Sequence, residues 1–271
     1  MCPSRTHHRP PLIKDTRMRT TAHSATLQDI LPLRELYRQE MNCQVIHDSI
    51  HDRKGWSNEY ALRTGDTLIG YGSVAVAGPW KDNPTIYEFY VLPHYRSRLF
   101  DLFEVLRAQC RSARIETQSN APLLTVMLHA LGHNVESESI LFHDKLTTAL
   151  PSQGATFGRA TPEDAAQISS NKLDSGARWL LELDGQIAAT GGILFHYNPP
   201  YGDIFMAVAE PFRRRGLGSY LVQELKRTCH EQGNTPAARC NTNNLPSRKT
   251  LQKAGFVPCG HILTASLPDA R

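Results

Sequence analysis

A short basic turn that contains two glycines, Arg213-Arg214-Arg215-Gly216-Leu217-Gly218, constrains this 271-residue chain more than any other segment. The apolar run 203–209 before it predicts a buried strand, and the leucines at 217, 221 and 225 have the spacing of one helix face. A helix that begins at such a turn leaves several backbone N–H groups unpaired, and its dipole adds partial positive charge. The sequence therefore predicts a binding site for a phosphate or pyrophosphate group.

The spacing of the turn excludes two common phosphate-binding motifs. The Gly-Lys-Ser/Thr of a P-loop is missing, and Leu221 stands where the third glycine of a dinucleotide-binding motif belongs. Downstream, a predicted strand leads into Asn241-x-x-Asn244-x-x-Ser247 and a short helix that ends in Lys253-Ala-Gly255-Phe256. Upstream, residues 177–194 predict a hairpin with an Asp-Gly turn, and Thr161-Pro162-Glu163-Asp164 has the composition of a helix start.

In this order, the segments of residues 155–266 resemble the GNAT superfamily of acyl-CoA-dependent N-acyltransferases. The spacing Arg213-x-x-Gly216-x-Gly218 is similar to the family's (Gln/Arg)-x-x-Gly-x-(Gly/Ala) turn. The resemblance implies that acetyl-CoA is the cosubstrate, and that its pyrophosphate meets the backbone N–H groups of the turn. It implies a cofactor-binding set of Met206, Val208, Arg213, Arg214, Arg215, Gly216, Leu217, Gly218, Ser219 and Asn244.

The amino-terminal part repeats the same plan at long period. A capped helix at Thr26, a hairpin over 60–74, an apolar strand over 86–92, a helix and a further strand follow one another. Arg96 aligns with Arg213, but Leu99 and Asp101 then occupy the two glycine positions. A side chain blocks close backbone approach and an aspartate repels phosphate, so this copy is expected to have lost the cofactor site.

We therefore expect the α/β (α+β) class, with two tandem GNAT-like domains, each a mixed, mostly antiparallel central sheet flanked by helices. The predicted boundaries are a basic flexible tail at 1–19, a degenerate GNAT-like domain at 20–150 and an acetyl-CoA-binding domain at 151–271. The first domain either helps to shape the acceptor pocket or serves only as a scaffold. The tail is either disordered or an extended start ahead of Met18.

The catalytic groups are less well defined than the cofactor site. The family commonly uses an acid on the central strand as general base, and Asp203 is the nearest acid on that strand. Glu88, in the matching strand of the first copy, is a second candidate if the two halves share a cleft. Asp203 is equally open to interpretation as a turn residue. Leu251 stands where many members carry a tyrosine that protonates the leaving thiolate. Either Ser247 or water takes that role, or the thiolate leaves without a general acid. Lys253 is open to two interpretations, a nucleotide-phosphate ligand or a solvated lysine.

Composition limits the remaining possibilities. Five basic residues and one acid lie in residues 1–19, which accounts for the whole net charge of +4, so a nucleic-acid surface is not expected. No apolar run approaches the roughly 20 residues of a membrane span, and the six scattered cysteines favour reduced thiols in a cytoplasm. The pair His47-x-x-x-His51 has metal-ligand spacing but is expected to be polar lining or a solvated face. No metal is expected.

The predicted activity is transfer of an acetyl group from acetyl-CoA to a primary amine of a small molecule. The alternatives are acetylation of a protein lysine or N-terminus, and a non-catalytic acyl-CoA sensor. A monomer or homodimer is expected.

Overall fold

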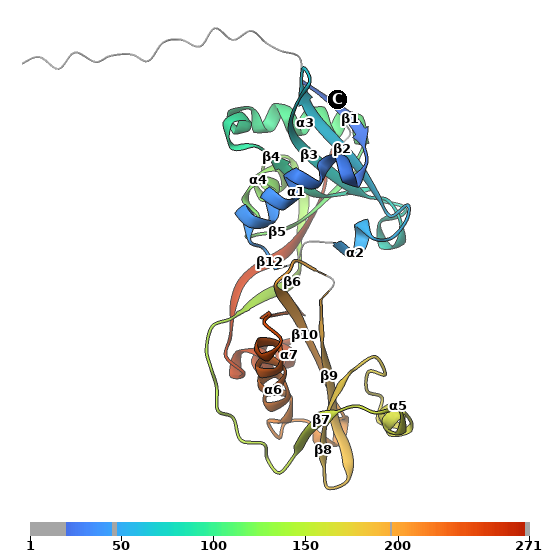
Figure 1. The fold of residues 1–271 in the computed structure, drawn as a ribbon, viewed down its shortest axis with the longest axis vertical. Helices are drawn as coiled ribbons and strands as arrows, with labels where there is room; N and C mark the ends of the chain where they lie inside the picture. Colours follow the sequence, from blue (N-terminus) through green and yellow to red (C-terminus); the bar gives the residue numbers. More distant parts are fainter. Residues whose placement is uncertain (1–19, 45–47, 196, 269–271) are drawn as a thin grey trace, which may run out of the picture.

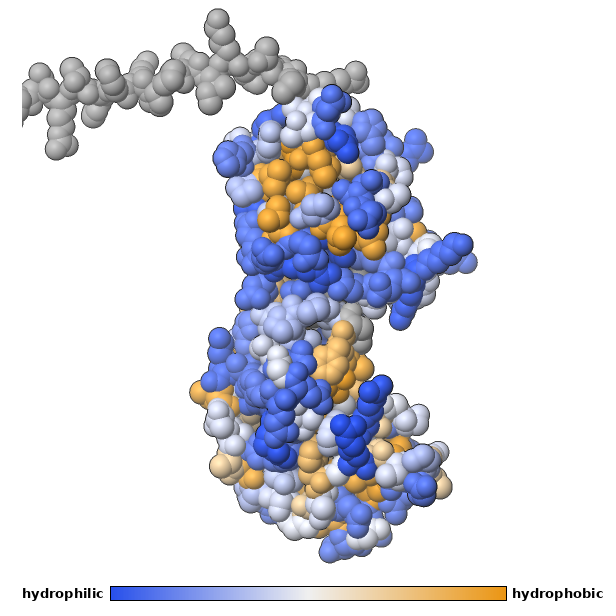
Figure 2. All heavy atoms as spheres, in the orientation of Figure 1, coloured by the Kyte–Doolittle hydropathy of each residue, from blue (hydrophilic) through white to orange (hydrophobic). Residues whose placement is uncertain are grey.

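One twelve-stranded sheet runs through the whole molecule, and helices cover it in two separate lobes (Figure 1). The computed structural model describes residues 20–44, 48–195 and 197–268. We call residues 20–144 the amino-terminal half and residues 145–268 the carboxyl-terminal half. Figure 2 shows the two lobes joined by a narrower waist, with hydrophobic side chains gathered on the visible face of the amino-terminal half.

The amino-terminal half follows the element order expected from the repeat. Its elements are β1 (Thr20–Ala25), α1 (Leu27–Met41), α2 (Asp48–His51), β2 (Ser57–Thr64), β3 (Thr67–Ala75), η1 (Gly78–Trp80), β4 (Thr85–Val91), η2 (Pro93–Arg98), α3 (Leu99–Cys110), β5 (Arg114–Gln118), α4 (Pro122–Leu131) and β6 (His133–Asp144).

The carboxyl-terminal half repeats that order. Its elements are β7 (Thr156–Arg159), η3 (Pro162–Asp164), α5 (Ala165–Ser170), β8 (Trp179–Leu183), β9 (Gln186–Leu194), β10 (Tyr201–Val208), η4 (Glu210–Phe212), α6 (Leu217–Glu231), β11 (Thr235–Asn241), α7 (Leu245–Lys253) and β12 (Phe256–Ser266). The predicted fold class, two tandem domains with mostly antiparallel sheets flanked by helices, is confirmed.

The two halves exchange their last strands. The sheet order is β1-β2-β3-β4-β5-β12-β6-β11-β10-β9-β8-β7, so β12 pairs with β5 of the first half and β6 pairs with β11 of the second. The two exchanged strands also pair with each other along the waist. The connection 145–155 contains no helix or strand. The predicted boundary near residue 150 stays a prediction, and the tail at 1–19 lies outside the described residues.

Local signals in the sequence account for the ends of several elements. Thr26 caps α1 in a reciprocal arrangement with Asp29, and Thr161 forms the same capping box with Asp164. Gly255 ends α7 in a left-handed conformation with φ of 88°. The predicted apolar face of α6 is buried in the core of the carboxyl-terminal half, because Leu221 and Leu225 are fully inaccessible to solvent.

Candidate active site

Strands β10 and β11 separate partway along their length. They pair in parallel only from Tyr201 with Thr235 to Ile204 with Ala238, although β10 continues to Val208. On its other side β10 stays paired with β9 as far as Val208. Residues 205–208 therefore present a strand edge that is not covered by β11, and an extended ligand arm can pair with such an edge.

The alternation of the β9–β10 ladder shows which backbone groups lie on that open edge. The N–H of Ala209 donates to the carbonyl of Ala188 on β9 at 2.9 Å, so the backbone groups of Ala207 also face β9. Those of Met206 and Val208 face the opposite way. The Val208 carbonyl accepts Nε of Arg213 at 3.1 Å, whereas the N–H groups of Met206 and Val208 remain directed into the separation.

The turn after β10 places further N–H groups beside the open edge. Among the described residues, no acceptor contacts the backbone N–H groups of residues 214–219, and α6 has no side-chain cap. Gly216 precedes α6 with φ of 86°, and Arg214 also has a positive φ of 62°. A Cβ built on Gly218 would lie 3.2 Å from Val208 Cγ2 and 3.3 Å from a methyl of Thr250, so glycine keeps this surface open.

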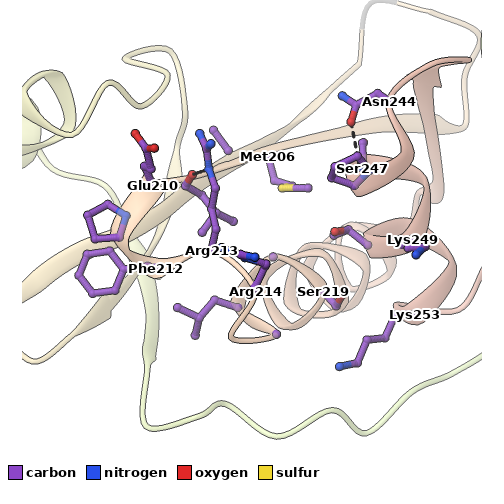
Figure 3. Close-up of a pocket in the computed structure, with 18 of the residues that line it drawn as sticks. Met206, Glu210, Phe212, Arg213, Arg214, Ser219, Asn244, Ser247, Lys249 and Lys253 are labelled. Carbon is purple, nitrogen blue, oxygen red and sulfur yellow. Dashed lines mark hydrogen bonds between the residues drawn. The ribbon is translucent and has the colours of Figure 1, made fainter.

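The turn, the open edge and α7 surround one cleft of about 1090 Å³ (Figure 3). Its basic side chains come from several elements, and Arg213, Arg214, Lys249 and Lys253 are drawn in Figure 3. The full lining is Asn171, Lys172, Met206, Ala207, Val208, Glu210, Pro211, Phe212, Arg213, Arg214, Gly216, Leu217, Gly218, Ser219, Asn244, Leu245, Pro246, Ser247, Lys249, Thr250 and Lys253.

The cleft brings together all the predicted cofactor residues but one. Arg215 does not line it, because its guanidinium lies over the Phe212 ring, 5.5 Å from the ring centroid. Sequence reasoning missed Lys172, Lys249 and Thr250. The helical spacing of Lys249 and Lys253 was a usable signal, whereas the approach of Lys172 depends on how α5 packs.

The start of α7 contributes the amide of its N-cap residue Asn244 and the hydroxyl of Ser247 to the cleft. The side-chain oxygen of Asn244 accepts the backbone N–H of Ser247 at 3.0 Å and so caps the helix, which leaves its amide NH₂ for a ligand. Ser247 lines the same wall. Leu251 is 3 % exposed and belongs to the hydrophobic core, so this position supplies packing and no proton donor.

Asp203 lies on β10 one residue before the last residue that pairs with β11. Its carboxylate pairs with Nε of Arg239 on β11 at 3.2 Å. Burial raises the pKa of Asp203, and Arg239 opposes only part of that effect, so the pKa lies at about 6. A carboxylate with this pKa is charged near neutral pH and accepts a proton readily.

Glu88 does not lie in the cleft, which corrects the idea of an acid shared between the halves. It is 1 % exposed inside the amino-terminal half, where both its oxygens accept hydrogen bonds from Arg34, at 2.8 and 2.9 Å. Burial opposes its charge, but Arg34 and then His51 outweigh burial and hold the pKa of Glu88 well below its usual range. A carboxylate so firmly ionised is a poor proton acceptor.

The matching turn of the amino-terminal half retains the arginine, but the guanidinium of this arginine is already bound within the same half. Arg96 Nε donates to the carbonyl of Val91 at 2.9 Å, which repeats the bond between Arg213 and Val208. The Arg96 guanidinium is bound by both oxygens of Glu40, at 2.5 and 2.7 Å. The Glu40 carboxylate therefore already binds the Arg96 guanidinium. In the carboxyl-terminal half, no carboxylate among the described residues pairs with the Arg213 guanidinium in this way.

The other sequence signals have structural explanations. The His51 side chain is 1 % exposed, so it does not belong to a solvated face, and its Nδ1 lies 2.9 Å from Glu59. His47 lies outside the described residues. Within the described ranges, no group of three metal-ligating side chains occurs. Burial raises the pKa of both Cys240 and Cys259, which fits unreactive thiols.

Comparison with known proteins shows a related family and related folds. Residues 145–256 match the model of the Acetyltransferase (GNAT) family. The structure resembles a GNAT-family acetyltransferase from Colwellia psychrerythraea, at 14% identity over 92% of this chain and 100% of that chain, with a TM-score of 0.73. The search of curated protein sequences gave no match.

Two further solved structures have the same fold over nearly the full chain. A tandem GNAT protein from the clavulanic acid biosynthesis pathway is 14% identical over 93% of this chain and 99% of that chain, with a TM-score of 0.61. A GCN5-related N-acetyltransferase from Sphaerobacter thermophilus is 14% identical over 92% of this chain and 96% of that chain, with a TM-score of 0.59. Residues 145–256 therefore form a domain that matches the GNAT acetyltransferase family, and both halves of the chain have the fold of these GNAT structures.

Proposed function

We propose that the protein transfers the acetyl group of acetyl-CoA to a primary amine of a small molecule. The observation that supports this proposal is that three features lie close together in the structure. The open edge at Met206 and Val208 begins where β10 and β11 separate, and the unpaired N–H groups of residues 214–219 lie beside that edge. The buried acid Asp203 lies on β10 just before the separation, next to the cleft but not among the residues that line it.

The proposed binding mode follows from the donors present. The N–H groups of the turn meet the pyrophosphate, and Arg213 and Arg214 add positive charge. The pantetheine arm pairs with the edge of β10, which brings the thioester oxygen to a backbone N–H of Met206 or Val208. The free amide of Asn244 faces the arm from α7. Lys249 and Lys253 lie where the nucleotide phosphate needs cations.

The proposed chemistry is direct attack of the amine on the thioester carbon. Asp203 accepts a proton from the acceptor ammonium, directly or through water, and leaves the nitrogen lone pair free. The new C–N bond forms and the C–S bond breaks, and the nitrogen gives up its surplus proton to water. The thiolate of CoA takes a proton from water or from Ser247, which regains one from water. A pKa of about 6 at Asp203 keeps the base charged above that pH.

A thiol-release assay with acetyl-CoA and a panel of amines tests this function. The panel contains an arylalkylamine, a diamine, an amino sugar, an α-amino acid and a lysine peptide. We expect turnover with a small amine, and loss of turnover in Asp203→Asn with binding of acetyl-CoA retained. Preference for the lysine peptide would favour protein acetylation, and tight binding without turnover on any amine would favour a sensor.

We also propose that the protein acts in the cytoplasm as a monomer or homodimer. Across the described ranges, no helix is both long and apolar enough to cross a bilayer.

A further inference from the structure

We propose that the amino-terminal half positions the active site of the carboxyl-terminal half, through a hydrogen bond from Arg38 to Asn198. This inference rests on the proposed function, because it assigns a role around the proposed base Asp203. It gives the amino-terminal half, whose turn does not form a phosphate site, a role in the reaction.

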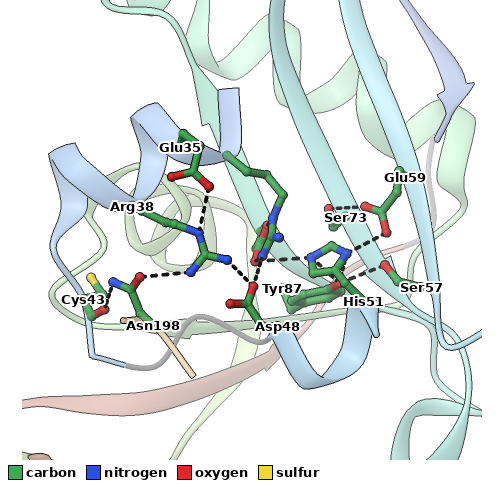
Figure 4. Close-up of polar contacts among 12 residues, drawn as sticks. Glu35, Arg38, Cys43, Asp48, His51, Ser57, Glu59, Ser73, Tyr87 and Asn198 are labelled. Atoms are coloured by element: carbon green, nitrogen blue, oxygen red, sulfur yellow. Dashed lines mark hydrogen bonds and ion pairs between the residues drawn. The ribbon is translucent and has the colours of Figure 1, made fainter. Parts of the chain in front are cut away.

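The segment before β10 is held by residues of the other half (Figure 4). Arg38 Nη1 on α1 donates to the side-chain oxygen of Asn198 at 3.0 Å, and Asn198 Nδ2 donates to the carbonyl of Cys43 at 2.7 Å. Tyr201 donates from its hydroxyl to the side-chain oxygen of Asn42 at 3.0 Å. Asn198 is only 2 % exposed, so both of its bonds lie in an environment where a lost partner is costly.

The residue before Asn198 contacts the proposed catalytic pair. The Tyr197 hydroxyl accepts a hydrogen bond from Arg239, and the Arg239 guanidinium lies 4.8 Å from the centroid of the Tyr197 ring. Arg239 in turn pairs with Asp203. The charged groups that act on this cluster are thus Asp203, Arg239 and, from β5, Glu116 near Tyr197. Fixing Asn198 therefore fixes Tyr197 against the ion pair that contains the base.

A second contact from the amino-terminal half lies at the point where β10 and β11 separate. The amide nitrogen of Gln44 lies 3.1 Å from the carbonyl oxygen of Phe142 on β6 and 3.5 Å from that of Ala238 on β11. Ala238 is the last residue of β11 that pairs with β10. The side-chain oxygen of Gln44 accepts from Cys259 at 3.3 Å, so one buried amide joins three strands of the exchanged sheet.

Arg38 is itself anchored by a network of charged side chains, the inner pair of which is buried. It pairs with Asp48, which also accepts a hydrogen bond from Arg34 at 3.0 Å, and Arg34 is the partner of Glu88. Arg34 and Glu88 are 3 % and 1 % exposed. The network joins α1 to α2 and β4 behind the contact. Removal of the Arg38 side chain leaves Asp48 with Arg34, so no buried charge loses its last partner.

Arg38→Met therefore removes the hydrogen bond from Arg38 to Asn198 and leaves the other contacts between the halves in place. Arg98→Met is the matched control, because Arg98 bonds Thr20 within the amino-terminal half at 2.9 Å. Three quantities are measured in both variants: acetyl-CoA affinity by calorimetry, kinetics with the best amine of the panel, and titration of Asp203 by carbon-13 NMR of labelled aspartate. Asp203→Asn assigns the signal.

We expect Arg38→Met to lower kcat/KM for the amine by about tenfold or more, because the reacting groups lose their alignment. The affinity for acetyl-CoA should stay within about twofold, because neither Arg38 nor Asn198 lines that cleft. Water reaching a loosened Tyr197 should lower the Asp203 titration from about 6 toward the ordinary aspartate range.

Wild-type kinetics and an unchanged Asp203 titration in Arg38→Met would overturn the proposal. Equal changes in Arg98→Met would also overturn it, since they would show a general loss of stability. A wild-type protein that acetylates no amine contradicts the proposed function, whereas the NMR titration still decides whether the amino-terminal half positions Asp203.

Discussion

At the scale of single residues, the pair of Asp203 and Arg239 sets the pH range in which the proposed base is charged. Burial raises the pKa of Asp203 and the guanidinium lowers it, with a balance at about 6. A base is active when deprotonated, so the rate should fall as pH drops through that value. The sequence marked Asp203 as a candidate, but it gave no sign of Arg239, which lies 36 positions later on a different strand.

Arg239→Gln tests this balance. Without the guanidinium, burial acts unopposed, so the pKa of Asp203 rises above about 6 and the acidic limb of the pH profile of kcat/KM moves to higher pH. The exposed Arg178→Gln, in the same half, should leave the profile unchanged. An acidic limb that stays in place or moves to lower pH in Arg239→Gln would argue against Asp203 as the base.

At the scale of elements, the strand, turn and helix of residues 201–231 were predictable from the chain alone. The glycines of the turn, the leucine spacing of α6 and the Asp-Gly hairpin turn are local signals, and each formed as expected. Leu251 shows the limit of such signals. Its position in the family pattern predicted a side chain that faces the cleft. Helix α7 instead packs so that the Leu251 side chain lies in the hydrophobic core. Helix rotation depends on contacts that are distant in sequence.

Leu221→Ala measures how much the buried face of α6 contributes. Leu221 is fully buried against the sheet, so its truncation should lower the free energy of unfolding by about 2–5 kcal/mol. Leu36→Ala on α1 is the control, because Leu36 is 42% exposed and should change stability by about 0.5 kcal/mol or less. Denaturant unfolding of both variants gives the comparison. Equal losses would mean that α6 is not packed as described.

At the scale of the whole molecule, the exchange of β6 and β12 ties the two halves into one sheet. The sequence predicted both copies and their element order, because these follow from local patterns. It did not predict the exchange, because the residues of β6 and β12 suit pairing with a strand of either half equally well. It also proposed Glu88 for a shared cleft, whereas the fold encloses Glu88 within its own half.

Separation of the chain at residue 150 tests the exchange. The piece 151–271 then lacks β6 and the piece 20–150 lacks β12, so β11 and β5 each lose a paired neighbour. We expect each piece alone to give a poorly dispersed NMR spectrum, and a mixture of the two to recover the dispersion of the full chain. Two pieces that fold fully and remain separate would contradict the described pairing.

The central claim is that the carboxyl-terminal cleft holds acetyl-CoA through the open turn at Gly218, and calorimetric titration with acetyl-CoA tests it most directly. Gly218→Asp places a carboxylate among the turn amides, while Gly218→Ala adds the same Cβ without charge, and Gly158→Asp adds the charge where a Cβ meets nothing within 4 Å. We predict saturable binding by the wild type and by Gly158→Asp, a modest loss in Gly218→Ala, and a loss of about 100-fold or more in Gly218→Asp. Normal binding by Gly218→Asp would contradict the account.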